Sequence, residues 1–278
     1  MITGAKDLLR PLYRRSGAAR AVAAWRRRPQ RFERERADYM RSHATAHSSS
    51  SADPALASLV EHGFVLVPAL HDAQLVRHLH DRLHDIMERV RRGERESGWD
   101  LVIYPEDGIY RLRRVETVLP ETSALLDHSR AAAIVKSYLG APFRSVDNYV
   151  DYKPDFVHDS TTIPHFDSWK SQVKIFTPLN AIGDANAPFV YWAHTHRDLA
   201  WRRRFDYAMW SGDYVGSAGL VPPHVLRDQA ALGGSDAPRE TTVTANPGDA
   251  IIADTRGIHR ASDLRGGYRL QIVQKFNI

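Results

Sequence analysis

Two short segments that lie far apart in this chain carry the side chains that most constrain its fold. The tripeptide His165-Phe166-Asp167 places an imidazole and a carboxylate two residues apart. Residues two apart on a β-strand point to the same side, so both can face one ion while Phe166 faces away. His259 lies far downstream, and two imidazoles with one carboxylate form the ligand set of a mononuclear non-haem iron site. The pattern predicts a fold that brings His259 to the strand of His165 and Asp167.

The sequence around His259 is typical of strands joined by tight turns. Residues 246–259 read as a Pro-Gly turn followed by an apolar strand with His259 near its end. An Arg-Gly-Gly turn follows at 265–267, and residues 268–276 alternate as a second strand. We expect a hairpin that carries Arg269 back beside the strand of His259. A guanidinium there suits a dicarboxylate that chelates the metal at one end and pairs with the arginine at the other.

Several segments between residues 56 and 276 match the motifs of one family. Residues 59–70 look like its first strand before a helix, and residues 186–196 are similar to its Asn-Gly-x-Leu segment ending in Pro-Gly-Ser-His. This chain departs from that segment with Ala187 in place of the usual glycine and Ala193-His194 in place of Pro-Gly. Together with residues 165–167 and 176–180, these segments make the chain resemble the phytanoyl-CoA dioxygenase-like family of iron(II)- and 2-oxoglutarate-dependent oxygenases.

The resemblance implies a fold, a ligand set and a reaction. The fold would be mainly β with flanking helices and a double-stranded β-helix (jelly-roll, cupin-like) core. By the family pattern His165, Asp167 and His259 would hold Fe(II), with 2-oxoglutarate as cosubstrate and O2 as oxidant. Arg269 would bind the distal carboxylate of 2-oxoglutarate, and Thr177 would border the cosubstrate.

The carboxylate at Asp167 bears on the outcome of that reaction. Related halogenases have Ala or Gly at this position, which opens a coordination site for chloride. The retained carboxylate therefore favours hydroxylation, with desaturation and ring formation as the alternatives. We expect a small-molecule substrate of specialised metabolism whose unactivated C–H bond is oxidised.

Composition agrees with a single globular enzyme domain. The chain has 278 residues, 43% of them hydrophobic, and no cysteine, which excludes disulfides, thiolate zinc sites and cysteine nucleophiles. No apolar run reaches the roughly 18 residues of a membrane span, and the amino terminus lacks the continuous apolar core of a secretory signal. These features predict a soluble, cytoplasmic protein.

The positive charge is concentrated near the amino terminus. Residues 1–42 contain twelve Lys and Arg against four acidic residues, although the whole chain carries a net charge of only +5. We predict a basic arm and Ser-rich linker at 1–52, followed by an oxygenase domain at 53–278. The arm can contact an anionic membrane, nucleic acid or an acidic partner. The alternative is a set of short helices that pack on the β domain with their arginines in solvent.

Two further features leave alternatives open. Residues 197–240 are rich in Trp, Tyr, Gly and Pro, which predicts either a lid over the site or a peripheral cover of the sheet. His194 and His196 form a His-x-His pair like those of cupin-type metal sites, but no glutamate follows within a few residues. A cupin-like metalloenzyme using this pair, or a catalytically silent protein that binds nucleic acid or an anionic surface, is therefore the alternative to an oxygenase.

Overall fold

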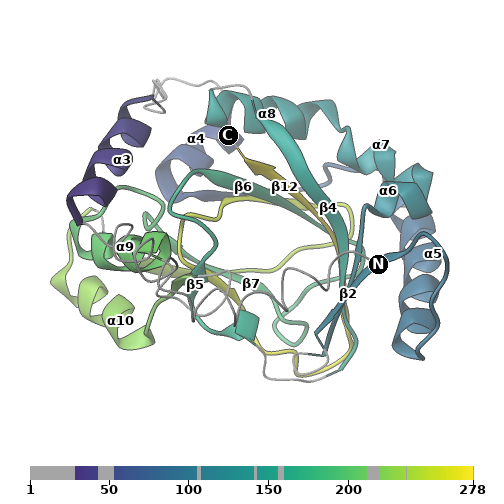
Figure 1. The fold of residues 1–278 in the computed structure, drawn as a ribbon. Helices are drawn as coiled ribbons and strands as arrows, with labels where there is room; N and C mark the ends of the chain where they lie inside the picture. Colours follow the sequence, from purple (N-terminus) through teal and green to yellow (C-terminus); the bar gives the residue numbers. More distant parts are fainter. Residues whose placement is uncertain are drawn as a thin grey trace, which may run out of the picture.

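Two facing antiparallel sheets form the centre of the molecule (Figure 1). The structure, a computed structural model, describes residues 29–42, 53–104, 108–140, 143–155, 160–211, 219–235 and 237–277. Within these ranges, the larger sheet has the strand order β1-β10-β6-β12-β4-β3-β2 and the smaller sheet the order β8-β5-β11-β7-β9. Helices flank both sheets. The prediction of a mainly β, jelly-roll fold with flanking helices is confirmed.

Each sheet contains strands from distant parts of the chain. The larger sheet contains β1 (Phe64–Val67), β2 (Asp100–Tyr104), β3 (Ile109–Arg113), β4 (Arg144–Lys153), β6 (Gln172–Pro178), β10 (Ala250–Asp254) and β12 (Arg269–Asn277). The smaller sheet contains β5 (His165–Phe166), β7 (Phe189–Ala193), β8 (Gly219–Leu220), β9 (Arg239–Val243) and β11 (His259–Ala261). The chain therefore crosses from one sheet to the other between β10 and β11, and again between β11 and β12.

Helix α5 (Ala73–Arg91) covers the outer face of the larger sheet. It begins where the Asp72 carboxylate accepts the backbone N–H groups of Gln74 and Leu75, an N-cap. Its apolar residues recur every three or four positions and pack on alternate residues of β3, β4 and β12. The residues between those alternate positions face the interior between the sheets.

A second group of helices covers the far end of the same sheet. Helices α4 (Pro54–His62) and α8 (Ser129–Leu139) pack on β1, β6 and β10 through an apolar cluster. Gly140 ends α8 in the left-handed conformation, with φ of 67°, and its N–H donates to Lys136 O. Short helical turns link these parts: α6 (Val115–Val118), η1 (Pro120–Thr122) and α7 (Ser123–Leu126).

The described part of residues 197–240 covers the outer face of the smaller sheet. It contains η3 (Ala200–Arg202), α9 (Arg203–Ser211), β8 and α10 (Pro223–Leu232). Phe205, Val225 and Leu226 pack against Phe166 and Ile258, whose neighbours in sequence point to the other side of the sheet. These contacts lie on the face of the smaller sheet that points away from His165 and His259, and residues 212–218 lie outside the described residues.

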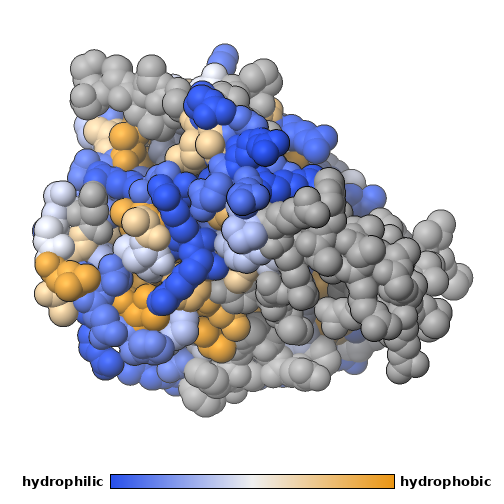
Figure 2. All heavy atoms as spheres, turned by 60° about the vertical axis from the view of Figure 1, so that its left-hand side comes forward, coloured by the Kyte–Doolittle hydropathy of each residue, from blue (hydrophilic) through white to orange (hydrophobic). Residues whose placement is uncertain are grey.

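Part of the predicted amino-terminal arm is a helix that packs on the domain. Helix α3 (Pro29–Ser42) inserts Phe32 among the rings of Trp169, Tyr207 and Trp210, at centroid distances of 5.5 to 5.9 Å. Phe32 is 1% exposed. The face over α3, α9 and α10 is largely hydrophilic, with apolar side chains in small separate groups (Figure 2). Residues 1–28 and 43–52, which hold most of the predicted basic arm and the linker, lie outside the described residues.

None of the helices in the described ranges combines the length and the apolar character that crossing a membrane requires.

Candidate active site between the two sheets

His165 and His259 are direct partners in the smaller sheet. Strand β11 pairs antiparallel with β5, and His259 stands opposite His165, with ring centroids 4.5 Å apart. Asp167 follows β5, and its backbone N–H donates to Thr255 O at 2.9 Å. Its Oδ2 lies 3.7 Å from His259 Nε2, and one donor atom from each of the three residues lies within 4.8 Å of the others. Strand pairing thus joins the two segments that the sequence separates widely.

Both histidine rings are held in the same way by the backbone. His165 Nδ1 lies 2.7 Å from Ile163 O, and His259 Nδ1 lies 2.9 Å from Gly257 O. A carbonyl oxygen can only accept, so each Nδ1 carries the proton and each Nε2 keeps its lone pair. This is the usual arrangement around metal-binding histidines, in which the second nitrogen donates to a backbone carbonyl. The tautomers are therefore those that a metal requires.

The electrostatics of the three residues also suit a divalent cation. Burial, reinforced by the neighbouring His165, lowers the pKa of His259 to about 3, so its ring is neutral at pH 7. Burial would raise the pKa of Asp167, but Lys174, His259 and His165 together hold it well below its usual range. The set can therefore offer imidazole nitrogen and an ionised carboxylate, which fits Fe(II) and its neighbours in the first transition row.

A cavity lies between the sheets beside these side chains. Its empty space, with the part that is open to solvent included, is about 630 Å³. His165 and His259 line it from the smaller sheet, and Arg269 lines it from the larger one. Its apolar wall consists of Phe176, Pro178, Ile182, Ala187, Phe189, Ile251, Ala261 and Val273. The cavity therefore lies between the two candidate histidine ligands and the predicted carboxylate-binding arginine, and the Asp167 carboxylate lies next to it, with Oδ2 3.7 Å from His259 Nε2.

Arg269 reaches this cavity by a different route from the one we predicted. Its strand, β12, pairs with β4 and β6 in the larger sheet and not with β11, so the expected hairpin is wrong. The turn at 265–267 instead carries the chain from one sheet to the other. Arg269 thus faces His259 across the cavity, because residues on the inner faces of two packed sheets point toward each other.

The Arg269 guanidinium is ordered by two partners. Nη2 donates to Asp151 Oδ2 at 3.0 Å, and Nη1 donates to Ala187 O at 3.0 Å. Its Nε is buried and has no hydrogen-bond partner among the described residues. Arg111 donates to the other oxygen of Asp151 at 2.7 Å. Burial would raise the pKa of Asp151, but these two arginines lower it to about 2, so one carboxylate stands between two guanidinium groups.

Sequence reasoning missed the roles of Asp151 and Lys174. Asp151 and Tyr149 are two residues apart on β4, and both line the cavity. Lys174 extends into the cavity from β6, and its Nζ lies 2.7 Å from Asp167 Oδ2. The signal for Lys174 was that it is the one charged residue of the segment 172–178, which otherwise reads as a buried strand.

Thr177 lies on the opposite face of its strand from the cavity. Lys174, Phe176 and Pro178 line the cavity, so the alternation of β6 turns Thr177 outward. Its Oγ1 lies 3.4 Å from His71 Nε2 on that side, and it is 4% exposed. The geometry does not bring Thr177 together with the other four predicted site residues.

His194 and His196 cap a helix and do not converge on one ion. His194 Nδ1 lies 3.0 Å from Glu61 O and His196 Nε2 lies 3.1 Å from Val60 O, so both rings donate to the last carbonyls of α4. The cluster that could hold a metal here combines His194 with the exposed Glu61 and His62, and leaves out His196. The geometry therefore does not favour a cupin-like site built on this histidine pair.

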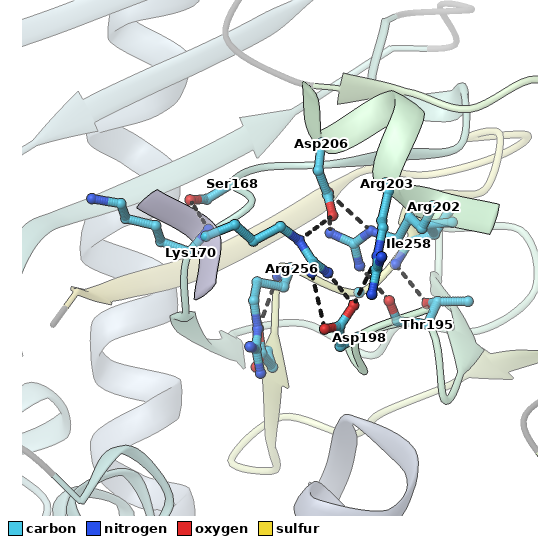
Figure 3. Close-up of polar contacts among 12 residues, drawn as sticks. Ser168, Lys170, Thr195, Asp198, Arg202, Arg203, Asp206, Arg256 and Ile258 are labelled. Atoms are coloured by element: carbon cyan, nitrogen blue, oxygen red, sulfur yellow. Dashed lines mark hydrogen bonds and ion pairs between the residues drawn. The ribbon is translucent and has the colours of Figure 1, made fainter. Parts of the chain in front are cut away.

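A buried ionic network supports the segment before His259 (Figure 3). Arg202 donates to Asp206 at 3.0 Å and to the backbone oxygen of Thr195. Arg36, from α3, pairs with Asp198 and lies 3.9 Å from Asp206. These contacts fix the turn after β7 against both α3 and α9. The turn after β7 also contacts the backbone of the connection between β10 and β11.

Comparison with known proteins establishes the fold. No protein-family model and no curated protein matches the chain. The epimerase SnoN, solved with Fe3+, alpha ketoglutarate and nogalamycin RO, has a TM-score of 0.57 and 17% identity, over 80% of this chain and 81% of SnoN. HygX from Streptomyces hygroscopicus, with nickel and 2-oxoglutarate, gives 0.54 and 16%, over 82% and 87%. EctD from S. alaskensis, with bound Fe, gives 0.57 and 14%, over 80% and 75%. The chain shares the fold of these enzymes.

Proposed function

We propose that this chain is an Fe(II)- and 2-oxoglutarate-dependent oxygenase that hydroxylates an unactivated C–H bond of a small molecule. The observation that carries the proposal is that His165, Asp167 and His259 lie together beside one cavity, which both histidines line and which Arg269 lines from the facing wall. Solved structures with the same fold contain iron or nickel with 2-oxoglutarate. The resemblance to the phytanoyl-CoA dioxygenase-like family points to the same cofactors.

The metal would be held by Nε2 of each histidine and by the Asp167 carboxylate. Both rings are already fixed by their Nδ1–H donations to backbone carbonyls, so binding needs little reorientation. Three protein ligands leave the remaining positions of the metal open for cosubstrate and O2. When bound, iron and 2-oxoglutarate supply the oxidising power, with succinate and carbon dioxide as the products of the cosubstrate.

The charges of the cavity suit a dianionic cosubstrate. Its wall carries four cationic side chains, Arg111, Lys174, Arg260 and Arg269, against one carboxylate, Asp151. The Arg269 Nε is a buried donor without a hydrogen-bond acceptor among the described residues, and the distal carboxylate of 2-oxoglutarate would supply one. Asp151 and Ala187 hold the rest of the guanidinium in place, so that Arg269 is oriented before the ligand arrives.

The apolar side chains control the surroundings of the reaction. Phe176 and Phe189 pack at 5.1 Å between ring centroids, and Phe189 also lies 5.7 Å from the His259 ring. This wall excludes water from the side of the metal position and strengthens every electrostatic contact in the cavity. We propose hydroxylation as the outcome because Asp167 keeps a carboxylate where a halogenase needs an open position.

The test is an anaerobic titration of the protein with Fe(II) and then with 2-oxoglutarate. We expect the weak visible charge-transfer band of a chelated 2-oxo acid. His165→Ala should abolish the band, while His78→Ala, an exposed histidine on α5, should leave it unchanged. Arg269→Met should weaken 2-oxoglutarate binding by at least tenfold without a comparable loss of metal affinity. A band that survives in His165→Ala would contradict the assignment.

The reaction itself is tested by aerobic turnover. Succinate release that rises on addition of a compound from a panel of candidate metabolites would identify a substrate. A product heavier by one oxygen atom, found by mass spectrometry, would support hydroxylation. A product lighter by two hydrogen atoms would instead indicate desaturation or ring formation.

A further inference from the structure

Lys174 holds an unusual position for a cation. It projects from β6 into the cavity, and its side chain is only 14% exposed. Its Nζ lies 2.7 Å from the Oδ2 of Asp167, the same oxygen that lies 3.7 Å from His259 Nε2. The ammonium group therefore stands beside the donor atoms that we assign to the metal.

The other cations of the cavity have partners that metal binding would leave in place. Arg111 and Arg269 share Asp151, and Arg260 lies 3.3 Å from Glu240. The partner of Lys174 is Asp167, and a metal bound to Asp167 would neutralise the charge of that carboxylate. Lys174 alone among these four would lose its counterion when the centre is loaded.

An ammonium group next to a divalent cation in a partly buried cavity is unfavourable unless an anion lies between or beside them. Like charges repel strongly at short range where water is largely excluded. The loaded site therefore needs another anionic group close to Lys174.

We propose that Lys174 binds a carboxylate of a small molecule held beside the metal centre. The inference rests on the proposed function, since it assumes a metal at His165, Asp167 and His259. The carboxylate can belong to 2-oxoglutarate or to the substrate. Because Arg260 is paired with Glu240, the cations to be counted are Arg111, Arg269 and Lys174. Together with a divalent metal they carry five positive charges, and Asp151 and Asp167 carry two negative charges. The remaining three positive charges are one more than 2-oxoglutarate neutralises. A substrate with a single carboxylate would complete the balance, and it is the source that we favour.

The experiment compares Lys174→Met with Lys275→Met in the iron-loaded protein. Lys275 pairs with Lys174 across β6 and β12, and it is not among the residues that line the cavity. The two variants remove the same charge from neighbouring positions. Thermal unfolding of each, with metal bound, checks that the fold is retained, and Lys174→Arg tests whether a cation alone suffices.

The readout is the charge-transfer band under anaerobic conditions, which needs no turnover. One arm is the 2-oxoglutarate titration, and the other is the response of the band to benzoate and to benzamide, its neutral counterpart, which suit the aromatic wall. Should the substrate be the source, wild type will bind benzoate at least tenfold more tightly than benzamide. Lys174→Met will lose this preference, whereas Lys275→Met and Lys174→Arg will keep it.

A tenfold or greater loss of 2-oxoglutarate affinity in Lys174→Met, but not in Lys275→Met, would assign the carboxylate to the cosubstrate instead. If Lys174→Met binds 2-oxoglutarate like wild type and the response to benzoate is also unchanged, the inference is overturned. It is overturned as well if Lys275→Met shows the same losses as Lys174→Met. Absence of the band in wild type would overturn the proposed function itself, which keeps the two failures apart.

Discussion

The backbone N–H of Ile258 donates to Oγ1 of Thr195 across 2.7 Å. Thr195 is fully buried in the turn after β7, and Ile258 is the residue before His259. The same threonine hydroxyl lies close to Trp192 O, to which it donates its own proton at 2.6 Å. One hydroxyl therefore connects the turn that Arg202 supports to the start of the strand that presents His259.

Replacing Thr195 by Val should loosen this connection without changing the volume of the side chain. The Ile258 N–H would be left buried without an acceptor, which costs about 1 to 3 kcal/mol. We expect that loss in the free energy of unfolding measured with urea, together with weaker binding of Fe(II). Thr242→Val, at an exposed position of β9, is the control and should change neither quantity. Wild-type metal affinity in Thr195→Val would show that the hydroxyl does not position His259.

Asp206 should be the most sensitive member of the ionic network. It lies between Arg202 and Arg36, and all three side chains are at most 8% exposed. Asp206→Asn would leave two buried guanidinium groups short of negative charge, which destabilises the fold by about 3 kcal/mol. Asp38→Asn breaks the exposed pair with Arg41 and should change stability by less than about 0.5 kcal/mol. Equal effects of the two variants would contradict the structural role of the network.

Gly257 should not tolerate a side chain. A Cβ at this position would lie 1.6 Å from the hydroxyl oxygen of Tyr191, whose ring is stacked on that of His259. Tyr191 is fully buried and donates to Asp254 O at 2.9 Å, so it cannot move aside freely. Gly257→Ala should destabilise the protein by at least about 2 kcal/mol, as overpacking does. Gly266→Ala, where a Cβ meets open space, is the matched control in the same thermal unfolding measurement.

His71 should make the stability depend on pH on the acid side. Burial, with a smaller contribution from His128, lowers its pKa from 6.5 to about 4. As the pH falls from 6.5 to 4, the unfolded chain takes up a proton that the native protein refuses, so stability is lost over this window. His71→Gln should reduce the loss between pH 7 and pH 4 by on the order of 2 kcal/mol. An unchanged loss of stability in His71→Gln, measured by urea unfolding at both pH values, would refute the prediction.

The features that follow from local geometry were predictable from the sequence. The alternation of a strand places His165 and Asp167 on one side, and the structure buries Phe166 on the other. The apolar repeat after Asp72 gives the helix Ala73–Arg91 with that aspartate as its N-cap. In both cases the local structure is determined by residues that are close together in the sequence.

The features that depend on distant pairing were not predictable. The turn at 265–267 was typical of a hairpin, but the partners of β12 are β4 and β6, and these contacts determine which sheet carries Arg269. The resemblance implies that Thr177 borders the cosubstrate, but the sequence does not reveal which face of its strand meets the cavity. The role of Lys174 depends on Asp167, and that of Asp151 on Arg111 and Arg269, which only the folded chain brings together.

Because His165 and His259 pair in adjacent strands, the proposed metal site forms only when β5 and β11 have the correct register. A slip of β11 by a single residue would turn the His259 ring to the opposite side of the sheet, toward the apolar layer beneath α9 and α10. A chain misaligned in this way would lose the proposed metal site while keeping most of its secondary structure. Binding of a metal at the proposed site would thus favour the correctly aligned molecules in a mixed population.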